Sequence, residues 1–161
     1  MEHLWSPWRM EYIMRNEPTS GCVFCQALQQ QDSPANLIVS RGKTAFVILN
    51  RYPYTSGHIM VASYAHRPSL DLLDAETRGE MMELVSRGLQ VLRAVYKPEG
   101  FNVGVNIGAA AGAGVADHVH IHVVPRWAGD TNFMSTLAGA RVLPEALEDT
   151  YRRLCEAWEA V

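Results

Sequence analysis

The segment "ADHVHIHVVPRW" (116–127) limits the possible folds of this chain more than any other stretch. His118, His120 and His122 alternate there with apolar residues. Side chains two residues apart in a β-strand point to the same face of the sheet. Residues 118–126 are therefore expected to form a strand with one apolar face and one face that carries the three histidines.

Other stretches predict further strands and two helices. "TAFVILN" and "HIMVAS", joined by turn residues within 35–66, favour strands, and so do residues 101–108. Residues 74–100 favour a long helix with Asp74 as its N-cap, and residues 143–161 favour a terminal helix. This order predicts an α+β fold in which an antiparallel sheet is covered on one face.

Composition excludes several classes of protein. The chain has 161 residues, 48% of them hydrophobic, which fits one domain with a sizeable core. A net charge of −3 does not fit a dedicated nucleic-acid binder. No apolar run approaches the roughly 18 residues that a membrane span needs, and the first residues do not resemble a secretion signal. We therefore expect a cytoplasmic protein whose three cysteines are thiols or metal ligands.

A glycine-rich loop, "GAAAGAG" (108–114), precedes the histidines. Consecutive backbone amides in such a loop can form a cradle for an anion. Neighbouring imidazoles disfavour each other's charge, which keeps one ring neutral and able to act as a nucleophile. Together, the loop and the histidines favour chemistry at phosphorus. The alternatives are a flexible turn and a polar or core strand without chemistry.

"CVFC" (22–25) has the spacing of half a zinc site. A redox pair and two buried thiols are the alternatives. A tetrahedral site needs two more ligands, for which His66 and one histidine of the triad are candidates. His118 or His122 would then bind the metal, leaving His120 for attack.

Two further stretches carry residues whose roles stay open. Asn50 and His58 flank a turn, where Asn50 can simply start the turn and His58 can be a surface residue. Trp127 and Phe133 can stack on a second base, pack at a dimer seam or pack in the core.

Taken together, these motifs resemble the histidine-triad (HIT) superfamily of nucleotide hydrolases and transferases. "HVHIHVV" is similar to its His-φ-His-φ-His-φ-φ signature, and the resemblance runs from about residue 20 to residue 134. "HLWSPWRMEYI" and "PRWAGDTNFM" are similar to the branch that contains diadenosine tetraphosphate phosphorylases.

The resemblance implies a HIT-like fold, with an antiparallel sheet of about five strands, one long helix and a C-terminal helix. It implies a single HIT domain over 1–161, with an N-terminal extension over 1–20 and a C-terminal extension over 128–161. Members pair as homodimers, so a homodimer that binds neither nucleic acid nor membrane is expected.

The resemblance also implies roles for the histidines. His120 would attack the α-phosphorus and form a nucleotidyl-histidine intermediate. A backbone carbonyl would fix the tautomer of its ring. His122 would bind the phosphates and assist the leaving group, and His118 and His58 would support the cluster.

Ligand-binding residues follow in the same way. Structural zinc would be held by Cys22, Cys25, His66 and His118, with no open position for water. The nucleotide would contact residues for the base, the ribose and the phosphates: Val23, Phe24 and Leu49 for the base, Asn50 for the ribose, and Asn106, Gly112 and Gly114 for the phosphates. His58 is expected among the nucleotide-binding residues as well.

The implied reaction is nucleotidyl transfer, with phosphorolysis of diadenosine tetraphosphate to ADP and ATP as the expected outcome. Gly114 departs from the family pattern, because many members carry Gln or Ser there. The missing side chain makes hydrolysis of dinucleoside polyphosphates or of purine nucleotide phosphoramidates the alternative. A non-catalytic nucleotide-binding regulatory module is the alternative from another class, and a purely structural zinc protein fits least.

Overall fold

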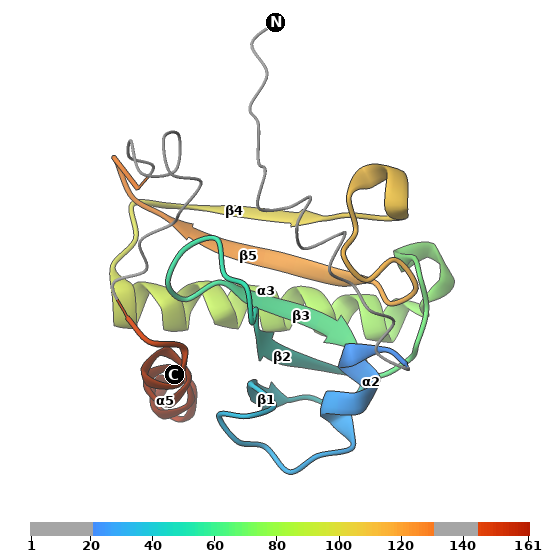
Figure 1. Ribbon diagram of the computed structural model, residues 1–161, viewed down its shortest axis with the longest axis horizontal. Helices are drawn as coiled ribbons and strands as arrows, with labels where there is room; N and C mark the ends of the chain where they lie inside the picture. Colours follow the sequence, from blue (N-terminus) through green and yellow to red (C-terminus); the bar gives the residue numbers. More distant parts are fainter. Residues whose placement is uncertain (1–20, 131–144) are drawn as a thin grey trace, which may run out of the picture.

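The computed structural model describes residues 21–130 and 145–161 of the chain. Its centre is a five-stranded antiparallel sheet in the order β1-β2-β3-β5-β4 (Figure 1). The strands are β1 (Ile38–Arg41), β2 (Ala45–Leu49), β3 (Ile59–Ser63), β4 (Gly100–Val105) and β5 (His120–Arg126). The predicted α+β fold with an antiparallel sheet of about five strands is confirmed.

Three α-helices lie in the described residues: α2 (Val23–Leu28), α3 (Ala75–Tyr96) and α5 (Leu147–Ala160). Two 3₁₀ turns, η1 (Leu70–Leu72) and η2 (Ala109–Ala111), lie in the connections. Helix α3 crosses one face of the sheet over β2, β3 and β5, and α5 packs against α3 and β1 (Figure 1). No helix in the described part of the chain is long and apolar enough to cross a bilayer.

The predicted boundaries differ from the observed ones by a few residues. The strand expected over 118–126 begins at His120, so His118 lies just before it. The helix in the stretch 74–100 ends at Tyr96, at the Lys97-Pro98 stop that the sequence predicts, and Lys97 adopts a left-handed conformation (φ 48°) there. Residues 1–20 and 131–144 lie outside the described residues, so the single-domain organisation stays a prediction.

Buried side chains lie between the sheet and α3 and also on the other face of β2 and β3. Every residue of β2 and β3 is buried, and the cross-strand partners Val47 and Val61 are both 0% exposed. Met81 and Leu92 of α3 are also 0% exposed, at the helical spacing seen in the sequence. Asp74 caps α3 as predicted, because its carboxylate accepts the Thr77 amide at 2.7 Å.

One partly buried contact ties α3 to the turn between β1 and β2. The Glu80 carboxylate accepts the backbone amides of Lys43 at 2.7 Å, Thr44 at 2.6 Å and Ala45 at 3.1 Å. Burial raises the pKa of this carboxyl. The hydrogen bonds from Thr44, Lys43 and Ala45 outweigh burial, and hold the pKa below its ordinary value. The charged form of Glu80 therefore stabilises the folded protein.

We predict that Glu80→Gln lowers the free energy of unfolding at pH 7 by about 2 kcal/mol, since an amide replaces a charged acceptor of several hydrogen bonds. A depressed folded pKa gives stability that is present above the unfolded pKa of about 4.3 and lost as pH falls through the folded value. The difference between wild type and variant should therefore shrink below about pH 4. Urea unfolding measures it, with Glu83→Gln on the exposed face of α3 as the control. Equal stability of the two variants at pH 7 would contradict the role of Glu80.

Candidate active site

Strand β5 carries His120 and His122 and lies between β3 and the edge strand β4. His122 pairs with Met60 on one side and with Gly104 on the other. The rings of His120 and His122 lie 4.8 Å apart between centroids. Because these side chains alternate with buried Ile121, they occupy one face of the strand, as the period of two predicted.

The ring of His120 has a defined tautomer. Its Nδ1 lies 2.9 Å from the carbonyl oxygen of His118. A carbonyl only accepts, so Nδ1 carries the proton and Nε2 carries the lone pair. Burial, at 3% exposure, lowers the pKa of His120 and outweighs the opposing backbone hydrogen bond. The predicted carbonyl partner is thus present, and a neutral ring with a nucleophilic Nε2 results.

A second chain of hydrogen bonds sets the tautomer of His122. The Tyr54 amide donates to Nδ1 of His58 at 3.1 Å, so this nitrogen is an acceptor. Nε2 of His58 therefore carries the proton and donates to Nδ1 of His122 at 3.0 Å. In its neutral form His122 then carries its proton on Nε2, where it can donate to a phosphate oxygen. His58 is 0% exposed, so the alternative of a surface residue is wrong.

A cavity of 790 Å³ lies against this face of the sheet. Its lining includes His120, His122 and the residues predicted to contact a nucleotide, apart from the buried His58: Val23, Phe24, Leu49, Asn50, Asn106, Gly112 and Gly114. Its volume lies within the usual range for small-molecule sites. The structure therefore brings the predicted residues together, although their roles in binding stay predictions.

Asn50 starts the turn and also lines the cavity. Its Oδ1 accepts the Tyr52 amide at 2.9 Å, which is a turn-starting contact. Its side-chain nitrogen lies 3.4 Å from Nδ1 of His58, and the residue also lines the cavity. The turn thus holds Asn50 at the edge of the site.

The glycine loop departs from the expected open anion cradle. Gly108 and Gly112 have positive φ values of 80° and 82°, which turn the chain through η2. The amides of Ala111 and Ala113 donate to the Gly108 carbonyl, and the Gly112 amide donates to Ala109. These three amides are used within the turn, so the expectation of a continuous run of unpaired amides is wrong for them.

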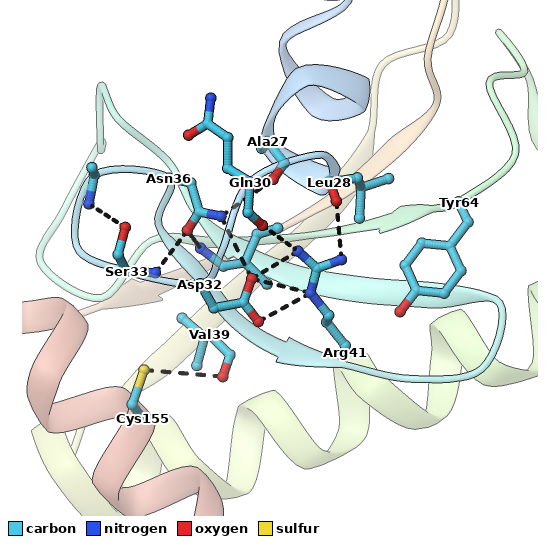
Figure 2. Close-up of polar contacts among 12 residues, drawn as sticks. Ala27, Leu28, Gln30, Asp32, Ser33, Asn36, Val39, Arg41, Tyr64 and Cys155 are labelled. Atoms are coloured by element: carbon cyan, nitrogen blue, oxygen red, sulfur yellow. Dashed lines mark hydrogen bonds and ion pairs between the residues drawn. The ribbon is translucent and has the colours of Figure 1, made fainter.

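One wall of the cavity is held by contacts that sequence reasoning missed. The Arg41 guanidinium donates to the Asp32 carboxylate and to the Gln30 carbonyl (Figure 2). The Nε–O distances to Asp32 are 3.0 Å, and the distance to the Gln30 carbonyl is 3.3 Å. The Asn36 amide donates to the Ala27 carbonyl at 3.2 Å. Gln30, Asn36 and Ala27 all line the cavity. Arg41 and Asn36 therefore fix the segment that follows α2.

Four predicted metal ligands meet at the other end of α2. The ligand atoms of Cys22, Cys25, His66 and His118 all lie within 4.8 Å of one another. Nδ1 of His118 is 3.3 Å from Sγ of Cys22 and 3.7 Å from Sγ of Cys25, and Nδ1 of His66 is 3.4 Å from Sγ of Cys25. Tetrahedral zinc places sulfur and nitrogen ligands about 3.6 Å apart. The cluster fits zinc.

The orientation of His118 supports the same conclusion. Its Nε2 donates to the Ser63 carbonyl at 2.8 Å, so Nδ1 presents its lone pair to the thiols. His122 contacts His58 and is absent from the cluster, so of the two triad histidines considered as ligands only His118 fits. Phe24, between the two cysteines, lies 5.1 Å from the His118 ring and 5.0 Å from the His120 ring. The metal cluster and the cavity therefore share α2.

Two aromatic residues stay without an assigned role. Trp127 follows β5, is half-buried, and donates its amide to Asp130 at 3.2 Å. Phe133 lies outside the described residues, as does the segment "HLWSPWRMEYI". Stacking or dimer packing by Trp127 and Phe133 stays a prediction.

Comparison with known proteins places this arrangement in a family. The HIT domain profile matches residues 30–129. The AP-4-A phosphorylase of Mycobacterium tuberculosis is 40% identical over 166 aligned residues, covering 98% of this chain and 85% of that protein. A Zn-bound histidine triad family protein from Mycobacterium smegmatis is 28% identical with a TM-score of 0.69, covering 87% of this chain and 94% of that one. A histidine triad nucleotide-binding protein from Sulfolobus tokodaii is 25% identical with a TM-score of 0.69, covering 86% of this chain and 93% of that one.

We predict that Arg41→Gln loosens the cavity wall, because the carbonyl and carboxylate contacts of the guanidinium are lost. Amides of residues 29–37 should exchange with deuterium at least about fivefold faster, which corresponds to roughly 1 kcal/mol for a partly exposed ion pair. Mass spectrometry of exchanged peptides measures this. The matched control is Arg152→Gln, which removes the exposed Arg152–Asp149 pair on α5. Unchanged exchange over 29–37 in Arg41→Gln would show that the contacts do not hold the wall.

Proposed function

This chain belongs to the HIT domain family, and we propose that it transfers a nucleotidyl group from dinucleoside polyphosphates to inorganic phosphate through a covalent intermediate on His120. The observation that carries the proposal is the neutral His120 ring, with Nδ1 bound to a carbonyl and the side chain lining a cavity beside His122. The 40% identity to a protein named AP-4-A phosphorylase supports diadenosine tetraphosphate as the substrate.

In the first half of the proposed reaction, the lone pair of Nε2 of His120 forms a bond to the α-phosphorus. The bond from that phosphorus to the bridging oxygen breaks, and ATP leaves. The Nε2 proton of His122 lies where it can stabilise the departing oxygen. In the second half, an oxygen of inorganic phosphate attacks the same phosphorus, the bond to His120 breaks, and ADP forms.

Side chains around the cavity provide the binding interactions that this reaction needs. Apolar Val23, Phe24 and Leu49 would contact the adenine, and the Asn50 amide would contact the ribose hydroxyls. Asn106 would contact the phosphates; its side-chain nitrogen is 3.4 Å from the Gly112 carbonyl, which orients it. His58 and His118 would position the rings that react.

The second candidate is hydrolysis, of dinucleoside polyphosphates or of purine nucleotide phosphoramidates. The observation in its favour is Gly114, which lines the cavity without a side chain to hold an acceptor phosphate. Three amides of the loop already donate within its own turn, so they are not available to hold an acceptor phosphate, which also favours hydrolysis. Water would then resolve the intermediate with the same histidines. A regulatory module without turnover would not need the buried, tautomer-defined His120.

We predict that diadenosine tetraphosphate yields ADP and ATP only when inorganic phosphate is present. His120→Ala should lower turnover at least about 1000-fold, because the covalent route is lost. It should leave AMP affinity within about threefold, since binding uses other residues. Chromatography of products and calorimetry measure both quantities.

AMP and ATP formed without phosphate would instead identify a hydrolase. A His120→Ala variant with most of its activity would contradict the assignment of the nucleophile in either reaction.

The proposal includes structural zinc on Cys22, Cys25, His66 and His118. Four protein ligands leave no position for a reacting water, so the metal would stabilise α2 and take no part in the transfer. The donor set of two thiols and two imidazoles is one that zinc prefers.

We predict one zinc ion per chain by metal analysis. Cys22→Ser should lower the metal content and reduce the midpoint of thermal unfolding by about 5 °C or more, because binding energy at a structural site is folding energy. Cys155→Ser is the matched control, since its thiol contacts the Val39 carbonyl away from the cluster. Wild-type protein without zinc, or equal loss in both variants, would contradict the proposal.

A cytoplasmic homodimer completes the proposal. All three cysteines are free thiols, which fits a reducing compartment. Strand β4 is an edge of the sheet, and Val103 on it is 46% exposed, which makes β4 a surface where a second copy can pair. Sedimentation analysis should give a dimer; a monomer at micromolar concentration would refute this part.

A further inference from the structure

A second cavity, of 380 Å³, adjoins the 790 Å³ cavity on the same side of β5. The larger one, which would hold the nucleotide, is called the nucleotide cavity below. Tyr54, Asn106 and His122 line both cavities. The two cavities therefore form one cleft with His122 at its middle. The first cavity lies on the α2 side of His122, and the second lies over β4 and the end of β5.

The alternation of β5 sets the direction of the second cavity. His122, Val124 and Arg126 lie two residues apart and all three line it. His122 and Arg126 lie about 13 Å apart along the strand, at roughly 3.3 Å per residue, so the cleft extends over that length. A ligand whose nucleotidyl group lies at His120 can thus continue along β5 as far as Arg126.

The chemistry of the second cavity favours an anion. Apart from histidines, the cationic side chains among the residues lining the two cavities are Arg51 and Arg126. Arg51 donates to the Ala35 carbonyl on the α2 side at 2.7 Å, so the cation beyond His122 is Arg126.

The guanidinium of Arg126 is held in place and retains capacity to bind. Nε and Nη2 donate to the Asp130 carboxylate at 2.6 and 2.8 Å, and Nη1 donates to Oδ1 of Asn102 at 2.7 Å. A guanidinium has five N–H groups, so these contacts leave two for a ligand. The side chain is 44% exposed, which allows a ligand to reach it. Asp130 offsets part of the positive charge of Arg126. The two remaining N–H groups can still donate to anionic oxygens of a ligand.

We propose that the second cavity binds the polyphosphate of the leaving nucleotide, with Arg126 as its anion-binding residue. This inference rests on the proposed function, and it assigns the part of the substrate that the nucleotide cavity does not hold. A nucleoside triphosphate fits as the departing group, because its phosphates extend from the reacting phosphorus toward Arg126. Pairing of a second copy at the edge of β4 would lie in the plane of the sheet and leave this face open.

The test compares two substrates that carry the same adenylyl group. Diadenosine tetraphosphate has a long anionic leaving group, whereas the leaving group of adenosine 5′-phosphoramidate is ammonia. Arg126→Gln should lower kcat/KM for the tetraphosphate at least about 10-fold, since it removes charged hydrogen bonds. The phosphoramidate value should stay within about twofold.

A second variant and a control separate binding from folding. Asn102→Asp keeps the acceptor for Arg126 but adds a negative charge to the cavity, and should reproduce the selective loss. Arg152→Gln, on an exposed pair of α5, should change neither substrate. Calorimetry with ATP and AMP gives a readout that needs no turnover: Arg126→Gln and Asn102→Asp should weaken ATP and leave AMP unchanged.

The outcomes distinguish this inference from the proposed function. Wild-type protein that turns over neither substrate would overturn the proposed function, while a selective loss of ATP affinity would still support the anion site. Unchanged tetraphosphate kinetics and ATP affinity in both variants would overturn the assignment of the second cavity as the polyphosphate site. Equal losses on both substrates and both ligands would overturn it too, because they would indicate a general disturbance of the site.

Discussion

The hydrogen bond from Nδ1 of His120 to the His118 carbonyl is the contact on which the proposed reaction depends. Without it, the proton of the buried ring could sit on either nitrogen, and the lone pair would not be fixed on Nε2. The bond connects residues two apart in sequence, so the course of the chain into β5 is enough to form it. His118 lies just before the strand, and its ring belongs to the cluster with Cys22, Cys25 and His66. One short segment thus divides its histidines between two sites.

Helix α2 links these two sites. It has only six residues and no side-chain cap, so its own hydrogen bonds do not suffice to hold it. Cys22 and Cys25 join it to His118 and His66 at one end, and Arg41 fixes the segment after its other end. Between them, Phe24 packs on the rings of His118 and His120. Loss of either anchor is therefore expected to disturb the cavity, because Val23, Phe24 and Ala27 of α2 all line it.

Features with a local signal could be predicted from the sequence. The period of two predicted the shared face of His120 and His122, and Asp74 before a helical stretch predicted its cap. Contacts between distant residues gave no such signal: Glu80 binds amides some 36 residues away, and Arg41 contacts Asp32 in a segment that reads as an ordinary loop. The residues alone gave His66 as a candidate metal ligand but left the choice between His118 and His122 open, and the family resemblance named His118. The use of the loop amides by their own turn depends on backbone angles that glycine allows but does not dictate.

The most direct measurement is of the intermediate itself. Wild-type protein mixed with diadenosine tetraphosphate in the absence of phosphate, quenched at alkaline pH within milliseconds and digested, should yield a peptide containing His120 whose mass is increased by one adenylyl group. The adduct should disappear when phosphate is added before the quench, with ADP released in equal amount. An adduct on another residue, or turnover with no adduct on any quench time scale, would contradict nucleophilic attack by His120.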